Sequence, residues 1–134
     1  MKLINKLSIV VSVYNEEAVL DKFYETILPI LEEIDSDYEL IFVNDGSRDA
    51  SPAILDRLAM DSKKVKVIHF SRNYGHEAAM IAGIDYSSGD GIVCVSILIS
   101  SSLISISIRL LRQSVSRISR QELLFSVRMS VLST

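Results

Sequence analysis

Residues 7–17 read LSIVVSVYNEE and residues 38–49 read YELIFVNDGSRD. In both stretches a short apolar run rich in valine or isoleucine ends in polar and acidic residues, and a helical pattern follows. Continuous apolar runs of this length are typical of strands that are buried on both faces of a parallel sheet. Since ligands bind such sheets outside the carboxyl ends of the strands, we expect Glu16 and Asp45 to face one shared cleft.

The first ninety residues alternate between strand and helix patterns. Apolar residues at three- and four-residue spacing predict a helix from about Glu17 to Ile34, in which Pro29 can produce a kink. Ser51 before Pro52 predicts the start of a second helix, with Ser51 as its capping residue. The other predicted elements are strands at 65–70 and 91–95 and a helix that starts after Gly75 and ends at Tyr86.

This element order, βαβαβαβ, predicts the fold class. Alternating strands and helices favour an α/β domain with a parallel sheet, right-handed crossovers and helices on both of its faces. At 134 residues and 49% hydrophobic content, the chain is long enough for one domain with a core.

Charge and cysteine content exclude several classes of protein. The net charge of −3 argues against a protein that coats nucleic acid or an anionic membrane, so we expect no nucleic-acid partner. The single cysteine, Cys94, excludes an internal disulfide framework and is expected to be a small buried hydrophobe. A cytoplasmic location fits this content, and residues 1–6 do not have the pattern of a signal peptide.

The composition changes abruptly near Gly91. Residues 1–90 contain nine Lys and Arg against sixteen Asp and Glu, whereas residues 91–134 contain twelve serines, five arginines and one acid, Glu122. After Gly91 the chain has no glycine, proline or lysine. A folded continuation of an α/β domain would supply turn residues, and here serine is nearly the sole candidate.

The loops after the first two predicted strands favour nucleotide recognition. Glu16 and Asp45 can accept hydrogen bonds from the N–H and hydroxyl groups of a nucleoside, and Tyr14 offers an aromatic face for its base. The same residues also occur in ordinary structures: Asp-Gly-Ser is a common turn, and acidic residues are common where a helix begins. Spacing alone leaves both interpretations open.

A third loop, residues 71–77 with the sequence SRNYGHE, lies between a predicted strand and a predicted helix. Gly75 permits a tight turn, and the N–H groups of the helix start can meet an anion. Arg72 and His76 can add charge or donors near a diphosphate. Taken singly, His76 is more often a surface histidine at a helix start than a ligand, and Arg72 is more often a solvated or acid-paired arginine.

These three loops, followed by Gly89 and Asp90, strongly resemble the family 2 glycosyltransferases. The resemblance covers about residues 6–95 and is greatest to the branch with dolichyl-phosphate mannose synthase and the bacterial polyprenyl-phosphate glucosyltransferases. It implies the N-terminal half of a GT-A fold. It also implies transfer of a sugar from a UDP- or GDP-sugar to a lipid phosphate, with full-length members at the cytoplasmic face of a membrane.

The resemblance assigns roles to individual residues. Tyr14 and Glu16 would contact the region of the base, and Asp45 the uracil or guanine and the nearby ribose. Asn73, Gly75 and His76 would border the pocket of the nucleotide sugar. The family often has proline at the position of Ser12 and aspartate at that of Asn44. Since Asp45 is the expected contact, Asn44 is compatible with the assignment.

One family motif is missing. After the fourth strand the family has Asp-x-Asp-Leu-Gln, whose carboxylates hold Mg²⁺ or Mn²⁺ against the diphosphate of the nucleotide sugar. Residues 95–101 here read VSILISS and contain no carboxylate. Serine and isoleucine cannot replace the anionic oxygen ligands of a hard cation, so we expect no metal site in this chain.

A shifted reading frame near residue 95 would explain both the missing motif and the change in composition. If residues 95–101 were encoded GTA-TCG-ATT-CTG-ATC-TCC-AG(C/T), loss of the first two bases would give Ile-Asp-Ser-Asp-Leu-Gln. Residues 1–95 would then be the nucleotide-sugar-binding part of the domain, and residues 96–134 an out-of-frame tail. The alternative is a divergent serine-rich tail.

Two functions therefore follow as expectations. The first is a truncated glycosyltransferase that binds UDP or GDP weakly and turns over little or no substrate, because the metal motif and the acceptor site are missing. The second is a noncatalytic α/β module that binds a nucleotide or a partner.

Overall fold

The computed structural model describes residues 5–33 and 36–97. The expectations for the tail beyond residue 97 lie outside the described residues. The strands are β1 (Lys6–Val13), β2 (Asp37–Asn44), β3 (Val65–His69) and β4 (Gly91–Ser96), and the helices are α1 (Leu20–Glu32), α2 (Ser51–Asp61) and α3 (His76–Tyr86). The predicted order βαβαβαβ is confirmed.

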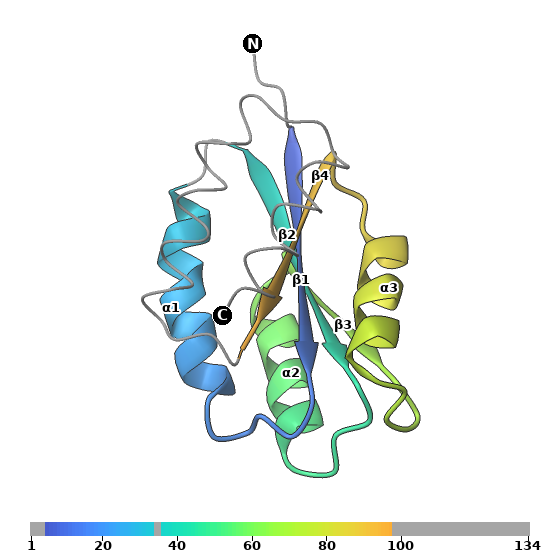
Figure 1. The fold of residues 1–134 in the computed structure, drawn as a ribbon. Coiled ribbons are helices and arrows are strands. Elements are labelled where there is room, and N and C mark those ends of the chain that lie inside the picture. Colours follow the sequence, from blue (N-terminus) through green and yellow to red (C-terminus); the bar gives the residue numbers. More distant parts are fainter. Residues whose placement is uncertain (1–4, 34–35, 98–134) are drawn as a thin grey trace.

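The four strands form one parallel sheet in the order β3-β2-β1-β4 (Figure 1). The two central strands are the ones quoted for their apolar sequence, and β2 is buried at every residue except Asp37. A parallel strand covered on both faces has no side that faces solvent, which is why residues 40–43 are all apolar and the polar residues Glu39 and Asn44 are buried with them.

Helices cover both faces of the sheet, as predicted. In Figure 1, α1 lies on one side of the sheet and α3 on the other. On one side, the rings of Phe23 in α1 and Phe42 in β2 meet edge to face, with centroids 6.3 Å apart. On the other side, α3 packs so closely that a Cβ built on Gly83 would lie 2.2 Å from Cγ1 of Val10.

The chain direction explains this arrangement. Two crossovers in the same direction carry the chain from β1 through β2 to β3, and since such crossovers share one hand, α1 and α2 lie on the same face. Contact between the two helices agrees with this, because Arg57 of α2 forms an ion pair with Asp21 of α1. The crossover to β4 runs back past β2 and β1, and therefore α3 lies on the opposite face.

Two predicted helix starts need correction. The first helix begins at Leu20 rather than Glu17, because residues 17–19 form a separate turn in which the N–H groups of Val19 and Leu20 both donate to the carbonyl oxygen of Glu16. Ser51 is the first residue of α2 but does not cap it: its hydroxyl accepts a hydrogen bond from the N–H of Glu16, and its own N–H donates to Asp49.

Other boundaries agree closely with expectation. The first helix continues through Pro29 to Glu32, and β3 ends at His69, one residue before the predicted Phe70. Cys94 is buried in β4, as expected. Within residues 5–33 and 36–97, no helix combines the length and apolarity needed to cross a membrane.

Candidate functional site

Three loops meet at the carboxyl edge of the sheet: residues 14–19 after β1, residues 45–50 after β2 and residues 70–75 after β3. The second and third loops touch at Gly46, whose φ is +71°. A Cβ built there would lie 2.2 Å from the backbone carbon of Arg72, so only glycine lets the two loops approach this closely. The three loops therefore lie together, as the sequence predicted.

The first and second loops exchange hydrogen bonds. Asn15, which has a φ of +51°, donates its N–H to Oγ of Ser47 at 2.9 Å and accepts the N–H of Arg48 on Oδ1 at 2.8 Å. Such reciprocal pairing satisfies backbone groups that would otherwise have no partner in a loop.

A second set of bonds joins the starts of α1 and α2. Asp49 accepts the N–H of Glu17 at 3.1 Å, and Glu17 in turn accepts the N–H of Ala50 at 3.1 Å. The Ser51 hydroxyl, fully buried, accepts the N–H of Glu16 at 2.9 Å. Glu17 and Asp49 thus connect two backbone segments and hold the first two loops in one arrangement.

Asp45 connects the second loop to the third. Its side chain is 3% exposed, and its two carboxylate oxygens accept the backbone N–H groups of Tyr74 at 2.7 Å and Gly75 at 3.1 Å. Its own N–H donates to the carbonyl oxygen of Val13 at 2.8 Å. Each carboxylate oxygen has a second lone pair, so the same group can still accept a donor from a ligand.

Glu16 lies beside this arrangement and is half-buried. Burial, together with the negative charge of Asp49, raises the pKa of the Glu16 carboxyl above its ordinary value. Among the described residues no donor forms a hydrogen bond with this carboxylate, although the N–H and carbonyl oxygen of Glu16 both have partners. Its oxygens are therefore available to a ligand that supplies N–H or O–H groups.

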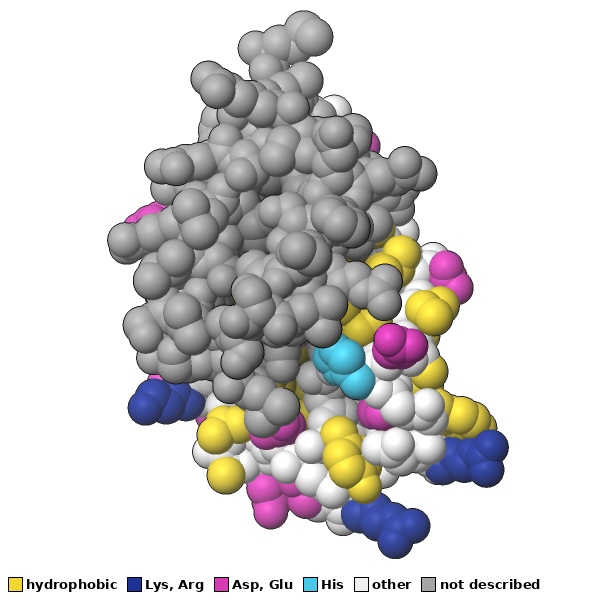
Figure 2. Space-filling model, in the orientation of Figure 1, with side chains coloured by type: hydrophobic (Ala, Val, Ile, Leu, Met, Phe, Trp, Pro, Cys, Tyr) yellow, Lys and Arg dark blue, Asp and Glu magenta, His cyan; other side chains and the backbone are white. Residues whose placement is uncertain are grey.

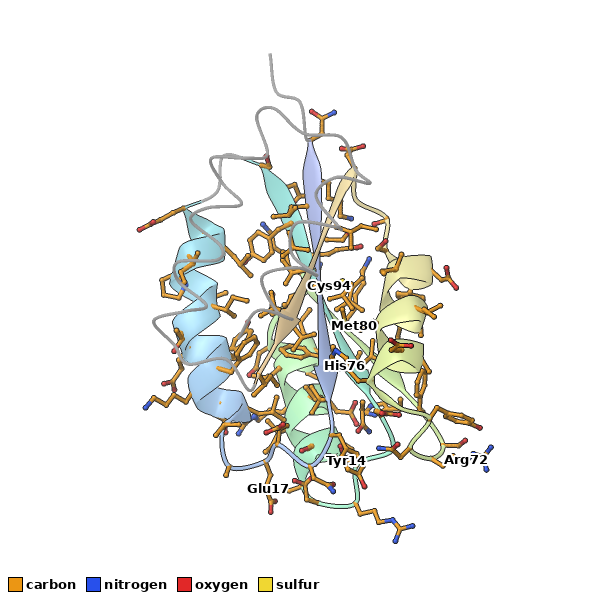
Figure 3. All side chains as sticks on the ribbon, viewed as in Figure 1. Tyr14, Glu17, Arg72, His76, Met80 and Cys94 are labelled. Carbon is orange, nitrogen blue, oxygen red and sulfur yellow. The ribbon has the colours of Figure 1, made fainter. Side chains whose placement is uncertain are left out.

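Ser12 and His76 add a polar pair at the end of β1. Oγ of Ser12 lies 2.6 Å from Nδ1 of His76, the first residue of α3. Gly75 comes directly before His76 and has a φ of +103°, a conformation that the tight turn into the helix requires. Ser12 thus holds the ring of His76 at the carboxyl edge of the sheet (Figure 3).

The remaining predicted site residues are exposed. Tyr14 is 46% exposed, and the side chain of Asn73 lies at the surface. Arg72 stacks on the ring of Tyr74, with its guanidinium carbon 4.6 Å from the centroid, and Figure 3 places it at the outer part of the loop, away from His76. The structure therefore does not bring Arg72 and His76 together.

The edge presents a mixture of apolar and acidic groups. Figure 2 shows acidic and hydrophobic side chains next to one another at the lower end of the molecule, with basic side chains at its margins. Such a surface suits a ligand that has both an aromatic ring and hydrogen-bond donors.

Sequence reasoning missed the residues that hold the loops together, namely Ser12, Asn15, Glu17, Ser47, Asp49 and Ser51. A signal was present, because asparagine, aspartate and serine in loops often accept nearby backbone N–H groups. Their residue types indicate this role, but the identity of each partner depends on the neighbouring loop.

The residues present do not fit the metal that the family resemblance implies. Within residues 5–33 and 36–97, no three His, Cys, Asp or Glu side chains gather in a way that could hold a metal ion. The chain continues from β4 into Ile97, which is buried, and residues 95–101 contain no carboxylate. No step through a metal ion is therefore assigned to this chain.

Comparison with known protein families shows which family this chain belongs to. The sequence model described as Glycosyl transferase family 2 matches residues 8–96, which include all four strands almost completely. The chain belongs to this family. The expectation from the sequence is thus confirmed for the family, whereas the nucleotide-binding roles of single residues stay predictions.

The chain also resembles individual members of this family in sequence. The chain is 47% identical over 88 residues to an uncharacterized glycosyltransferase, YkcC, of Bacillus subtilis (strain 168), a match that covers 66% of this chain and 27% of that protein. It is 39% identical over 92 residues to the bactoprenol glucosyl transferase of Shigella phage SfV, covering 69% and 30%. The matches thus span less than a third of the length of these relatives.

Solved structures show the same fold. The mannosyltransferase PcManGT from Pyrobaculum calidifontis, in complex with GDP-Man and Mn²⁺, aligns with a TM-score of 0.60 at 16% identity over 81% of this chain and 32% of that one. Staphylococcus aureus TarS 1-349, in complex with UDP-GlcNAc, aligns with a TM-score of 0.62 at 18% identity over 81% and 31%. The four-stranded sheet is thus the N-terminal part of a GT-A fold.

Proposed function

We propose that the described residues are the nucleotide-sugar-binding half of a glycosyltransferase whose full domain passes a sugar from a UDP- or GDP-sugar to a polyprenyl-phosphate-type lipid. The observation that carries this proposal is Asp45, which lies buried where three loops meet in a chain that matches family 2 over residues 8–96. The lipid acceptor is supported by the bactoprenol glucosyl transferase of Shigella phage SfV and by a relative from Proteus mirabilis, 38% identical over 91 residues, that is named undecaprenyl-phosphate 4-deoxy-4-formamido-L-arabinose transferase.

Each residue at this edge has its own role in binding the nucleotide sugar. The Glu16 carboxylate accepts N–H or O–H donors of the nucleoside, since among the described residues it has no donor of its own. Tyr14 offers its exposed ring to the base, and Asp45 accepts a further donor from the base or ribose. Asn73, Gly75 and His76 border the sugar-diphosphate side.

The donor set favours recognition of the nucleoside over the diphosphate. Glu16, Asp45 and Asp49 give this edge a negative character, which repels a diphosphate that lacks a counterion. The N–H groups of the first turn of α3 can offset part of this repulsion. We therefore expect modest affinity for UDP or GDP. Lipid phosphates are already ionised, so the complete enzyme would need positioning groups for its acceptor rather than a general base.

The first experiment measures the thermal stability of the full chain with UDP, GDP, UDP-glucose and GDP-mannose. We expect at least one of these nucleotides to raise Tm, and Glu16→Gln to weaken the effect because it removes the anionic acceptor. Asp61→Asn, at the far end of α2, is the matched control and should leave the shift unchanged. Absence of a shift with every nucleotide would contradict the proposed function and would favour a noncatalytic module that binds a partner.

We also propose that residues from about Ser96 onward are read out of frame. The support is the change of composition near Gly91 and the Asp-Ser-Asp-Leu-Gln sequence that a shifted frame can produce. Sequencing of the gene and of its counterparts in related strains tests this. An uninterrupted frame that encodes the same serine-rich tail in several strains would refute it.

A further inference from the structure

A chain of hydrogen bonds runs behind the Asp45 loop and involves none of the residues assigned to the nucleotide. Asn44, the last residue of β2, lies directly opposite His69, the last residue of β3. Nδ2 of Asn44 is 3.0 Å from Nδ1 of His69, and Nε2 of His69 is 2.7 Å from Oδ1 of Asp56 in α2. Asn44 is 3% exposed, so its amide depends on these protein partners.

The bonds determine where the hydrogens lie. The backbone N–H of Ser47 donates to Oδ1 of Asn44 at 3.0 Å, which turns the amide oxygen toward the loop and the amide nitrogen toward His69. An amide nitrogen only donates, so Nδ1 of His69 must accept. The proton of the neutral ring is then on Nε2, where it donates to Asp56. A single arrangement of hydrogens satisfies all three bonds.

These bonds hold the ends of the turn that carries Asp45. The side chain of Asn44 holds the N–H of Ser47, and its backbone oxygen accepts the N–H of Phe70 at 2.9 Å. Asp45 and Gly46 lie between these fixed points and touch the third loop. A change in the Asn44 side chain would therefore displace the Asp45 carboxylate relative to the loop that it binds.

We propose that His69 and Asp56 are positioning residues for nucleotide binding. Through Asn44 they hold the turn at residues 44–47 in the arrangement in which Asp45 meets a nucleotide. The identity of the ligand as a nucleotide rests on the proposed function. The tautomer of the His69 ring and the hydrogen bonds of Asn44 do not depend on it.

Two substitutions make opposite predictions. His69→Phe keeps a planar ring but removes the acceptor, so the amide nitrogen of Asn44 loses its partner and the turn loosens. Asn44→Asp keeps the acceptor for Ser47 but places a carboxylate oxygen against Nδ1 of His69. The contact can then be kept if Nδ1 carries a proton and donates it to the new carboxylate, and in that case the turn is preserved.

The ligand-free test is nitrogen-15 NMR of the histidine rings in the full chain at neutral pH. The Nε2–H tautomer is expected for His69 in the unsubstituted protein, and a proton on Nδ1 in Asn44→Asp. The backbone amide signal of Ser47 should move in His69→Phe. The hydrogen bonds from Asn44 through His69 to Asp56 are here called the relay. An Nδ1–H tautomer in the unsubstituted protein, or a Ser47 signal that His69→Phe does not change, would show that the relay does not form.

The binding test uses UDP and GDP with the same proteins. His69→Phe should weaken the affinity for whichever of UDP and GDP binds more tightly by about fivefold to tenfold, which is the scale of one lost hydrogen bond. Asp56→Ala breaks the relay at its exposed end, where the side chain is 62% exposed, so it tests the same role should His69→Phe fail to fold. Asp61→Ala, on the same helix, is its matched control.

The outcomes separate the two proposals. Folded His69→Phe and Asp56→Ala proteins with unchanged affinity would overturn the positioning role. If the unsubstituted chain binds neither nucleotide, the proposed function fails and the positioning role fails with it, while the ligand-free NMR still decides whether the relay exists.

Discussion

Glu39 lies in β2 with 1% of its surface exposed, and its carboxylate contacts residues from three other segments. It accepts hydrogen bonds from Ser8 of β1 at 3.0 Å, from Lys66 of β3 at 2.9 Å and from the N–H of Ser88 at 2.8 Å. Burial acts to raise its pKa, but these hydrogen bonds outweigh burial and lower the pKa to about 2. The group thus joins the loop before β4 to the three other strands.

Glu39→Gln is expected to lower the free energy of unfolding by about 3 kcal/mol, because it removes one charge from a buried group and leaves Lys66 without its counterion. Since the folded pKa is depressed from 4.5 to about 2, the stabilisation is complete above pH 4.5 and is lost as the pH falls toward 2. Urea unfolding at several pH values measures this. Equal acid sensitivity in both proteins would contradict the prediction.

Gly46 and Gly75 provide a matched pair of positive-φ glycines. A Cβ at Gly46 would meet the backbone of Arg72 at 2.2 Å, whereas a Cβ at Gly75 would meet nothing within 4 Å. Both alanine variants carry a backbone strain of about 1 to 3 kcal/mol. Gly46→Ala should lower the free energy of unfolding by about 2 kcal/mol more than Gly75→Ala does, because the second and third loops must separate to make room for the Cβ. Urea unfolding of both variants tests this, and equal losses would show that strain alone matters at Gly46.

At the scale of the elements, the packing of α3 on the sheet depends on a small residue. A Cβ at Gly83 would lie 2.2 Å from Cγ1 of Val10 and 3.2 Å from Cγ2 of Val43. Alanine is the better helix former by about 1 kcal/mol, but a side chain here would push the helix away from β1 and β2.

We expect Gly83→Ala to destabilise the protein by about 1 to 2 kcal/mol, since overpacking exceeds the gain in helix propensity. A double-mutant cycle with Val10→Ala identifies the cause, because removal of the valine methyl groups makes room for the new Cβ. Val10→Ala should therefore cost less in the Gly83→Ala background than alone. Strictly additive losses would place the collision elsewhere.

At the scale of the whole molecule, the described residues contain the edge that is proposed to bind the base, but no carboxylate after β4. We therefore expect Mn²⁺ to leave the nucleotide affinity of this chain unchanged, and turnover of a nucleotide sugar to be undetectable with or without it. Isothermal titration with and without Mn²⁺ measures the first, and release of free nucleotide measures the second.

The control for this prediction is a protein in which the reading frame after β4 is restored. Expression from a gene that encodes Ile-Asp-Ser-Asp-Leu-Gln after β4 should give nucleotide binding that Mn²⁺ strengthens. If Mn²⁺ strengthens binding by the present chain as well, the metal has ligands other than those of the missing motif.

Much of the fold could be predicted, because the apolar pattern of a segment depends on local sequence. Strands such as Val65–His69 and helices such as His76–Tyr86 were placed to within one residue. The meeting of the three loops followed from the rule that parallel strands end at one edge. The start of the first helix was predicted too early, because residues 17–19 form a turn that is bonded to the second loop, where Glu17 exchanges hydrogen bonds with Asp49 and Ala50.

By itself, the sequence determined the family, the element order and the edge at which Asp45 lies, since apolar periodicity and motif order are written along the chain. Only the tertiary structure decided which group each polar side chain bonds. Asp45 holds the third loop, and Asn44 selects one tautomer of His69, because the sheet brings these distant segments within hydrogen-bond distance. A hydrogen bond needs both a donor and its position, and residue type specifies only the first.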